Sequence, residues 1–429
     1  MQVDIINLGC SKNLVDSEKL LSQLRAQGIP ARMDPLHINA DVLIINTCGF
    51  ILDAKEESVN TILEAIDAKK IGRIRRIFAI GCLVQRYRNE LIAEMPEVDA
   101  WFGVDQMEEI ISALKLTFNP KILNHRQIST PKHYAYLKIS EGCNRECSFC
   151  AIPSIRGKYV SRKMEDILDE AAYLADHGTR ELLLIAQDLS YYGRDLYRKS
   201  MLVPLLESMV RIDKIRWIRL HYAYPESFPQ GLAELMARED KICKYLDIPL
   251  QHISDKMLKM MNRGYSKEDT FQIISEIRKK VPGAAIRTSL IVGHPGETDK
   301  EFEELLKFVN DSRFERLGVF TYSPEEGTRS GDVYPDDIPE EVKQERFSII
   351  MEAQRIISAE INAGRIGSTI EVVIDRKDGE FYIGRSQYDS PEVDQEILVT
   401  SPGKKLRTGC FYQTTITGSD EYDLYAKHQ

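Results

Sequence analysis

Short apolar runs alternate with amphipathic stretches along the first hundred residues. Three of the runs, residues 3–8, 42–45 and 77–80, are rich in β-branched side chains, which is typical of strands buried on both faces of a sheet. A pattern of helical period follows each of them. This alternation predicts a Rossmann-like parallel sheet, in which ligand sites form beyond the carboxyl ends of the strands.

The helices between these strands carry start and stop signals. Asp16 or Ser17 is expected to cap the first helix, and a capping-box pattern begins at Asp53 for the second. The third helix should stop near Pro96. After one more strand, Asp105 is expected to cap the helix that completes this part of the chain.

The middle of the chain repeats the strand–helix pattern six times. The expected strands are residues 135–139, 181–185, 217–220, 245–248, 285–291 and 316–320. Amphipathic helical patterns lie between them. Six repeats predict a partial (βα)6 barrel rather than a closed eight-fold one, with the active-site face at the carboxyl ends of its strands.

The last part of the chain changes character. A long helical pattern over residues 339–363 precedes short β runs at 369–374, 381–384, 396–399 and 409–416, as in a small antiparallel β-barrel. The sequence therefore predicts an α/β multidomain protein. Its expected domains are residues 1–117 with the parallel sheet, 129–358 with the partial barrel and 361–427 with the small barrel.

Composition narrows the class of protein. The chain has 429 residues, 43% of them hydrophobic and 29% charged, with a formal charge of −9. No apolar run approaches the roughly 20 residues of a membrane helix, and no signal-peptide pattern opens the chain. We therefore expect a cytoplasmic protein without a membrane partner. In that compartment cysteines stay reduced, so the eight present are expected to be metal ligands or core residues rather than disulfides.

The charge also argues against a protein that grips nucleic acid through a broad basic face. From Gly364 to Gln429 the chain has eight Lys and Arg against eleven Asp and Glu, a balance of 8 − 11 = −3. A field of this sign opposes phosphate binding by the small barrel. Direct nucleic-acid binding is therefore not expected to dominate.

One loop carries the clearest chemistry. Cys143, Cys147 and Cys150 form a C-x3-C-x2-C array directly after the first barrel strand. Thiolates at this spacing select zinc or an iron–sulfur cluster. A structural zinc site normally closes with four ligands, and no fourth Cys or nearby His completes this array. An iron–sulfur cube held by three thiolates would keep one iron open to another ligand.

Three further cysteines follow the three N-terminal strands. Cys10, Cys48 and Cys82 come from distant points of the sequence, yet all would lie at one edge of the sheet, each beside a glycine. Buried structural thiols are the alternative, because cysteine is among the most buried residue types. Glycine permits the close backbone approach that a bulky cluster needs, which favours a second metal site.

With both triads in view, the sequence resembles the radical S-adenosylmethionine superfamily and, within it, the methylthiotransferases, which end in a TRAM module. The resemblance covers nearly the whole chain. Residues 9–18 (GCSKNLVDSE) and 152–157 (IPSIRG) are similar to the branch that modifies a ribosomal protein rather than the tRNA branch. Two departures are Leu189-Ser190, where two threonines are usual, and His294, where an apolar residue is usual.

The resemblance implies an enzyme with two 4Fe–4S clusters and S-adenosylmethionine. Cys143, Cys147 and Cys150 would hold the cluster that binds S-adenosylmethionine, and Cys10, Cys48 and Cys82 a second cluster associated with the inserted sulfur. The cofactor would also contact five residues near strand ends: Gln187, Gly293, Pro295, Gly296 and Glu297. No catalytic side chain beyond the clusters is implied.

The implied reaction is methylthiolation of the β-carbon of an aspartate in small-subunit ribosomal protein twelve, either free or in the ribosome. Two molecules of S-adenosylmethionine and an electron-donor protein would take part. An unactivated C–H bond yields no proton to a side chain at neutral pH, so a cofactor-derived radical is needed. Two alternatives stay open: a tRNA adenosine methylthiotransferase, and a non-enzymatic protein with structural zinc.

Overall fold

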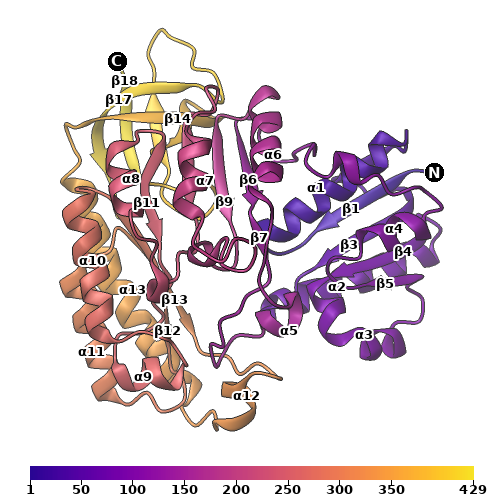
Figure 1. Cartoon of the computed structure of the whole chain (residues 1–429), viewed down its shortest axis with the longest axis horizontal. Helices are drawn as coiled ribbons and strands as arrows, with labels where there is room; N and C mark the ends of the chain where they lie inside the picture. The colour runs from indigo at the N-terminus through magenta and orange to yellow at the C-terminus, as the bar shows by residue number, and fades with distance from the viewer. The chain divides into compact units, whose positions relative to one another are not determined.

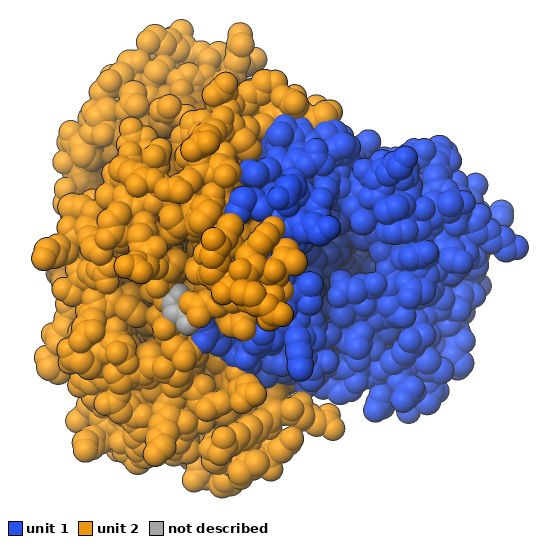
Figure 2. Space-filling view, viewed as in Figure 1, with its two compact units in different colours: residues 1–130, 136–145, 150–174 blue, residues 131–135, 146–149, 175–429 orange. Residues whose placement is uncertain are grey.

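The structure, a computed structural model, describes residues 1–429 apart from the side chain of Ser227. The chain forms two compact units (Figure 2). Unit 1 contains residues 1–130, 136–145 and 150–174, and unit 2 contains residues 131–135, 146–149 and 175–429. Among the described residues no helix is long and apolar enough to cross a membrane.

The core of unit 1 is a five-stranded parallel sheet in the order β2-β1-β3-β4-β5 (Figure 1). Its strands are β1 (Val3–Asn7), β2 (Ala31–Met33), β3 (Ala40–Thr47), β4 (Ile74–Gly81) and β5 (Ala100–Phe102). The predicted parallel sheet is thus confirmed. The apolar side chains of β1, β3 and β4 are buried on both faces, which explains their continuous hydrophobic runs.

Helices connect β1 to β2, β3 to β4 and β4 to β5, and a fourth helix follows β5. They are α1 (Ser11–Ala26), α2 (Leu52–Lys70), α3 (Cys82–Glu94) and α4 (Met107–Ala113). The third helix ends two residues before Pro96, as predicted, but the capping predictions were wrong. The N-cap positions are Cys10 for α1, Ile51 for α2 and Gln106 for α4, none with a side-chain cap hydrogen bond. The first two helices begin immediately beyond the strand-end cysteine turns, so Asp16 and Asp53 lie inside them.

Unit 1 also contains the start of the central domain. Its elements are η1 (Pro120–Ile122), the antiparallel pair β7 (Ser140–Glu141) and β8 (Val160–Ser161), α5 (Ile152–Arg156) and α6 (Met164–Asp176). Arg126 is buried among them and forms ion pairs with Glu18 of α1 and Glu170 of α6. These paired charges hold helices from the beginning and middle of the sequence together.

The central sheet has six strands in the order β13-β12-β11-β10-β9-β6, and β9 to β13 are parallel. The strands are β6 (Tyr134–Lys138), β9 (Glu181–Ile185), β10 (Trp217–Leu220), β11 (Ile242–Asp247), β12 (Ala285–Val292) and β13 (Arg316–Thr321). All six predicted strands are present, β9 and β10 with the predicted bounds. An open six-stranded sheet of this order is the predicted partial barrel.

Helices and short turns separate the strands of unit 2. They are η2 (Leu189–Tyr191), α7 (Leu202–Met209), η3 (Pro225–Ser227), α8 (Leu232–Arg238), α9 (Asp255–Met260), α10 (Lys267–Lys280), α11 (Asp299–Ser312), α12 (Arg329–Val333) and α13 (Glu340–Ala363). Capping boxes begin α10 at Ser266 and α11 at Thr298. The long helix predicted near residues 339–363 is α13.

The C-terminal module is a closed five-stranded barrel in the order β14-β15-β16-β18-β17. Its strands are β14 (Thr369–Asp378), β15 (Phe381–Arg385), β16 (Ile397–Thr400), β17 (Phe411–Ser419) and β18 (Leu424–His428). The prediction of a wholly antiparallel barrel needs correction, because β16 and β18 pair in parallel. The last strand escaped prediction, and closure through it leaves no free sheet edge.

Candidate functional site

Three strand ends of unit 1 bring Cys10, Cys48 and Cys82 to one edge of the parallel sheet. Asn7 of β1 lies opposite Asn46 of β3, and Thr47 lies opposite Gly81 of β4, so the three strands end at the same level. The cysteine of each segment follows within three residues. The structure therefore gathers the segments as the sequence predicts.

Glycines allow these segments to press together. Gly9 has a φ of +88°, and a Cβ there would lie 2.8 Å from Cys48 Cβ and 3.1 Å from its Sγ. A Cβ on Gly49 would lie 2.7 Å from the backbone nitrogen of Leu83. Any larger residue at either position would push apart two of the cysteine-bearing segments.

The pKa values of the three N-terminal thiols are shifted in different directions by their surroundings. Burial alone would raise the pKa of Cys10, but Lys12 and Arg156 outweigh it and lower that pKa below its usual value. Burial raises the pKa of Cys82 to about 11 and also raises that of Cys48. Cys10 is therefore the thiol most ready to ionise, whereas the buried two require a strong partner for the thiolate, such as a metal centre.

The second cysteine loop follows β7. All three of its cysteines are half-buried, and none forms a disulfide bond. The Sγ of Cys143 accepts a hydrogen bond from the backbone N–H of Arg145 at 3.4 Å. In unit 2, the Sγ of Cys147 accepts one from Nη1 of Arg263 at 3.2 Å, and the hydroxyl of Tyr224 lies 4.0 Å from the same sulfur. These contacts fix the position of the Cys147 sulfur on the loop.

Three thiols on one loop, without a fourth cysteine beside them, would suit a cluster with one iron left open. No group of three or more His, Cys, Asp and Glu side chains in the described part of the chain is arranged to hold a single metal ion. The thiolates of both triads are soft ligands, of the kind that holds zinc or an iron–sulfur cluster.

The Gly-His-Pro-Gly-Glu turn follows β12 at the carboxyl edge of the central sheet. Glu297 is buried, accepts a hydrogen bond from the backbone N–H of Gly293, and lies 3.4 Å from Nη1 of Arg346 of α13. Burial raises the pKa of this carboxyl to about 7. These contacts give Glu297 a part in holding the turn, with Pro295 and Gly296 between its two anchored ends.

His294 of the same turn reaches the cysteine loop. Its Nε2 lies 2.9 Å from the hydroxyl of Ser330, and that hydroxyl lies 2.7 Å from the hydroxyl of Ser148, the residue after Cys147. Nδ1 of His294 lies 3.0 Å from the carbonyl of Pro295. The histidine that departs from the family pattern thus connects the turn to the loop.

Three other polar residues predicted at this edge are Gln187, His221 and His252. Gln187 is half-buried two residues beyond β9. His221 is buried against Ser390, 3.1 Å from its hydroxyl. Nδ1 of His252 accepts hydrogen bonds from the backbone of Ile253 and Ser254. Both histidines are therefore held in place by hydrogen bonds within the protein, as lone buried histidines usually are.

Sequence reasoning missed three side chains beside the cysteines: Asn13, Arg156 and Arg263. Arg156 lies within the IPSIRG segment that supported the resemblance, and Asn13 lies within GCSKNLVDSE. No pattern in the sequence separates these residues from ordinary surface polar residues. Their positions depend on contacts across 143 residues for Asn13 and Arg156, and 116 residues for Arg263 and Cys147.

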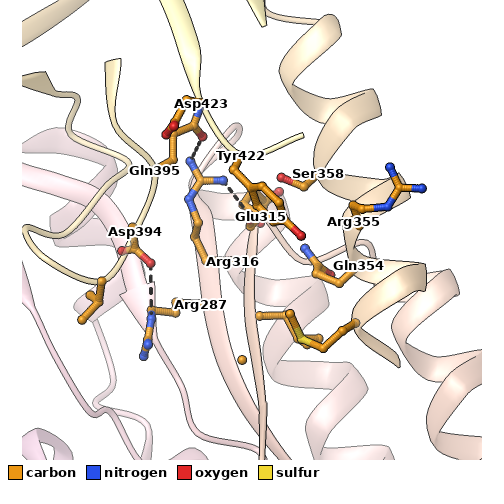
Figure 3. A pocket seen from close by; sticks show the side chains of 14 residues that line it. Arg287, Glu315, Arg316, Gln354, Arg355, Ser358, Asp394, Gln395, Tyr422 and Asp423 are labelled. Atoms are coloured by element: carbon orange, nitrogen blue, oxygen red, sulfur yellow. Dashed lines mark hydrogen bonds and ion pairs between the residues drawn. The ribbon is translucent and has the colours of Figure 1, made fainter. Parts of the chain in front are cut away.

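A cavity of about 270 Å³ lies elsewhere in unit 2 (Figure 3). Arg287 near the start of β12 and Arg316 at the start of β13 line it, with Gln354 of α13 and Gln395 before β16. It is thus at the amino ends of the strands. Active sites of parallel βα sheets form at the carboxyl ends, so this cavity is separate from the cysteine loop.

Comparison with known proteins defines the class first. The Radical SAM superfamily matches residues 137–309, an Uncharacterized protein family, UPF0004, matches residues 2–103, and the TRAM domain matches residues 366–428. The superfamily implies S-adenosylmethionine and a 4Fe–4S cluster as cofactors. Among solved structures, the radical S-adenosylmethionine methyltransferase TsrM from Kitasatospora setae has a TM-score of 0.59 at 14% identity, over 77% of each chain. This likeness shows the fold.

Curated relatives then narrow the class. The chain is 52% identical to the ribosomal protein uS12 methylthiotransferase RimO of Bacteroides thetaiotaomicron, over 99% of this chain and 98% of the relative. It is 52% identical to that of Porphyromonas gingivalis and 50% identical to that of Cytophaga hutchinsonii, again over 99% of this chain. The chain belongs to the RimO family of radical S-adenosylmethionine methylthiotransferases.

Proposed function

We propose that this chain methylthiolates the β-carbon of an aspartate in ribosomal protein uS12. The observation that carries the proposal is the 52% identity to uS12 methylthiotransferases across 99% of the chain. The two cysteine triads support it, because the proposed chemistry needs one centre for S-adenosylmethionine and another for sulfur. An electron-donor protein is a further partner that the proposal requires.

Cys143, Cys147 and Cys150 would hold the first 4Fe–4S cluster. When bound, this cluster and S-adenosylmethionine supply a radical strong enough to take hydrogen from an unactivated carbon. The chain itself shields the site. Cys147 packs against three buried side chains, those of Tyr224, Leu258 and Tyr265, and this packing limits the access of water to its sulfur.

Gln187 and the turn of Gly293, Pro295, Gly296 and Glu297 would contact the cofactor. Their position supports this assignment, because they follow β9 and β12 at the edge where ligands of parallel sheets bind. Glu297 anchors this turn from within, so its contribution to binding would be to hold the backbone of the turn in place.

Cys10, Cys48 and Cys82 would hold a second 4Fe–4S cluster, at which the inserted sulfur is bound. The close approach of their three chain segments supports this assignment. The low pKa of Cys10 and the positive charge of Arg156 favour thiolates there. Although many atoms surround its thiol, part of Cys10 reaches the surface, which would keep one side of this centre accessible to the aspartate.

The proposal is tested by mass spectrometry of uS12 from cells that lack their own enzyme and express this chain. We expect uS12 to gain one methylthio group on an aspartate, whether it is isolated free or within ribosomes. The matched control is Cys143→Ala, which should leave uS12 unmodified. An unmodified uS12 together with methylthioadenosine in tRNA would overturn the proposal in favour of the tRNA reaction.

A further inference from the structure

Arg156 is a buried cation of unit 1 whose partners lie in chain segments next to Cys10 and Cys143. It is the last residue of α5, six residues after Cys150, and only 5% of it is exposed. Burying a guanidinium is costly unless charged and polar partners surround it. Its partners therefore show what this position requires.

The guanidinium joins segments from both ends of the unit. Its Nη1 donates to Glu141 Oε1 at 2.7 Å and lies 3.5 Å from Asp16 Oδ2. Its Nη2 donates to Oδ1 of Asn13. Glu141 stands two residues before Cys143, and Asn13 stands three residues after Cys10, so one side chain connects the segments of both triads.

Asn13 is held in a single orientation by its other contacts. Its Nδ2 donates to the carbonyl of Leu8 at 3.0 Å and to that of Thr47 at 3.1 Å. Its Oδ1, which accepts from Arg156, also lies 3.6 Å from the Sγ of Cys82. The amide thus contacts the segments leading to Cys10 and Cys48 on one side and the third cysteine on the other.

Arg156 shares its carboxylate partners with a second cation. Lys138 pairs with both Asp16 and Glu141, and Asp105 lies near the same charges. Thiolates at the adjacent triad would add negative charge next to this group. Arg156 is the member of the group whose Nη2 faces toward the triad through Asn13, so it is placed to compensate that charge.

We infer that Arg156 is a positioning residue for the triad of Cys10, Cys48 and Cys82. Through Asn13 it sets the spacing of the three segments, and its charge stabilises the thiolates that bind a cluster. The inference rests on the proposed function, which places a 4Fe–4S cluster at this triad. Outer partners of metal ligands commonly change metal affinity about 10- to 100-fold when removed.

The test isolates the N-terminal triad. In a parent with Cys143, Cys147 and Cys150 all changed to Ala, only that triad can hold a cluster, and iron and sulfide are measured after anaerobic reconstitution over a range of iron concentrations. We expect Arg156→Met in this parent to bind iron about tenfold or more weakly. The cluster it does hold should have a lower reduction potential, because a nearby positive charge favours the reduced state.

Arg162→Met is the matched control, because Arg162 lies in the same segment but pairs with Glu170. It should retain the iron affinity and potential of the parent. Arg156→Met with parental iron affinity and potential would overturn the inference. A parent that binds no iron would instead overturn the second cluster of the proposed function, so the two failures are distinguishable.

Thermal unfolding of the iron-free proteins distinguishes an effect of Arg156 on folding from an effect on cluster binding. If Arg156→Met does not fold, Arg156→Lys is measured instead. Lysine keeps the positive charge, but its single ammonium group cannot donate to Glu141 and Asn13 at the same time in the way the planar guanidinium does. We expect Arg156→Lys to unfold near the parental temperature and still bind iron about tenfold more weakly. Parental affinity in that variant would overturn the inference.

Discussion

Arg263 donates a hydrogen bond from Nη1 to the Sγ of Cys147 across 3.2 Å. The same guanidinium donates to the hydroxyl of Tyr265 and to the carbonyl of Pro249, and it lies 4.2 Å from the ring centre of Tyr224. Arg263 is therefore held rigidly while it presents a charged donor to one cysteine of the radical loop.

Replacing Arg263 with Lys is expected to lower the reduction potential of the first cluster without abolishing iron binding. Hydrogen bonds to cluster sulfurs and nearby positive charge raise such potentials, and lysine would lose the directed donor. A potentiometric titration followed by electron paramagnetic resonance measures the change, in a Cys10→Ala background that leaves only this cluster. Arg316→Lys, at the cavity of Figure 3, is the control for loss of a buried guanidinium. Equal potentials in the two variants would contradict this prediction.

Removing one cysteine from either triad should remove the iron of that triad alone. The wild-type chain is expected to hold about eight irons, and Cys143→Ala and Cys10→Ala about four each. Iron and acid-labile sulfide analysis after anaerobic purification provides the measurement. Cys410→Ala, at a half-buried cysteine of the C-terminal barrel, should keep the full content. Zinc in place of iron in every variant would support the structural alternative.

Glu170 makes the stability of unit 1 dependent on pH. Burial alone would raise its pKa, but Arg162 and Arg126, at 2.7 and 2.6 Å, lower it from 4.5 to about 2. The stabilisation is therefore complete above about pH 4.5 and is lost as the pH falls toward 2. Glu170→Gln should cost about 3–5 kcal/mol at neutral pH, because buried guanidinium groups lose their carboxylate.

Thermal unfolding at pH 7 and pH 4 checks this prediction. The difference in unfolding temperature between wild type and Glu170→Gln should be smaller at pH 4, because this is below the unfolded-state pKa of 4.5 and the stabilisation from the ionised Glu170 has begun to fall. Asp311→Asn removes an exposed carboxylate that pairs with Lys307 within α11, and it should change the unfolding temperature little at either pH. A difference independent of pH would show that Glu170 acts through packing alone.

Ser330→Ala should weaken the attachment of the cysteine loop, residues 143–150, to the turn that carries His294. Ser330 is fully buried and bridges His294 to Ser148, so its loss leaves two buried polar groups with one partner fewer. We expect a loss of about 1–3 kcal/mol in unfolding free energy. Faster hydrogen exchange in residues 146–149 would show that the loop is the segment affected. Ser348→Ala, on the exposed side of α13, is the control.

The strands were predictable because burial on both faces produces continuous apolar runs, as in β3 and β9. The helix starts were not, because α1 and α2 begin at the strand-end turns, where Cys10 and Ile51 occupy the N-cap. Short β2 has only three residues, and Arg32 interrupts its apolar pattern. Local signals cannot show such starts or such short strands.

The cysteines were recognisable from spacing and strand-end position, whereas their neighbours were not. Arg156 and Arg263 are identified only once the chain is folded, because each meets its partners across more than a hundred residues. His294 stood out as unusual in its motif, but only the structure connects it to Ser148 through Ser330. Tertiary contacts, rather than local pattern, select these residues.

The amide of Asn13 also has an evolutionary consequence. Its two donors meet backbone carbonyls at Leu8 and Thr47, and every amino acid supplies such a carbonyl. The contact itself therefore does not depend on which side chains stand at these two positions. Aspartate at position 13 would instead turn an acceptor toward both carbonyls, so natural variation should be narrow at position 13.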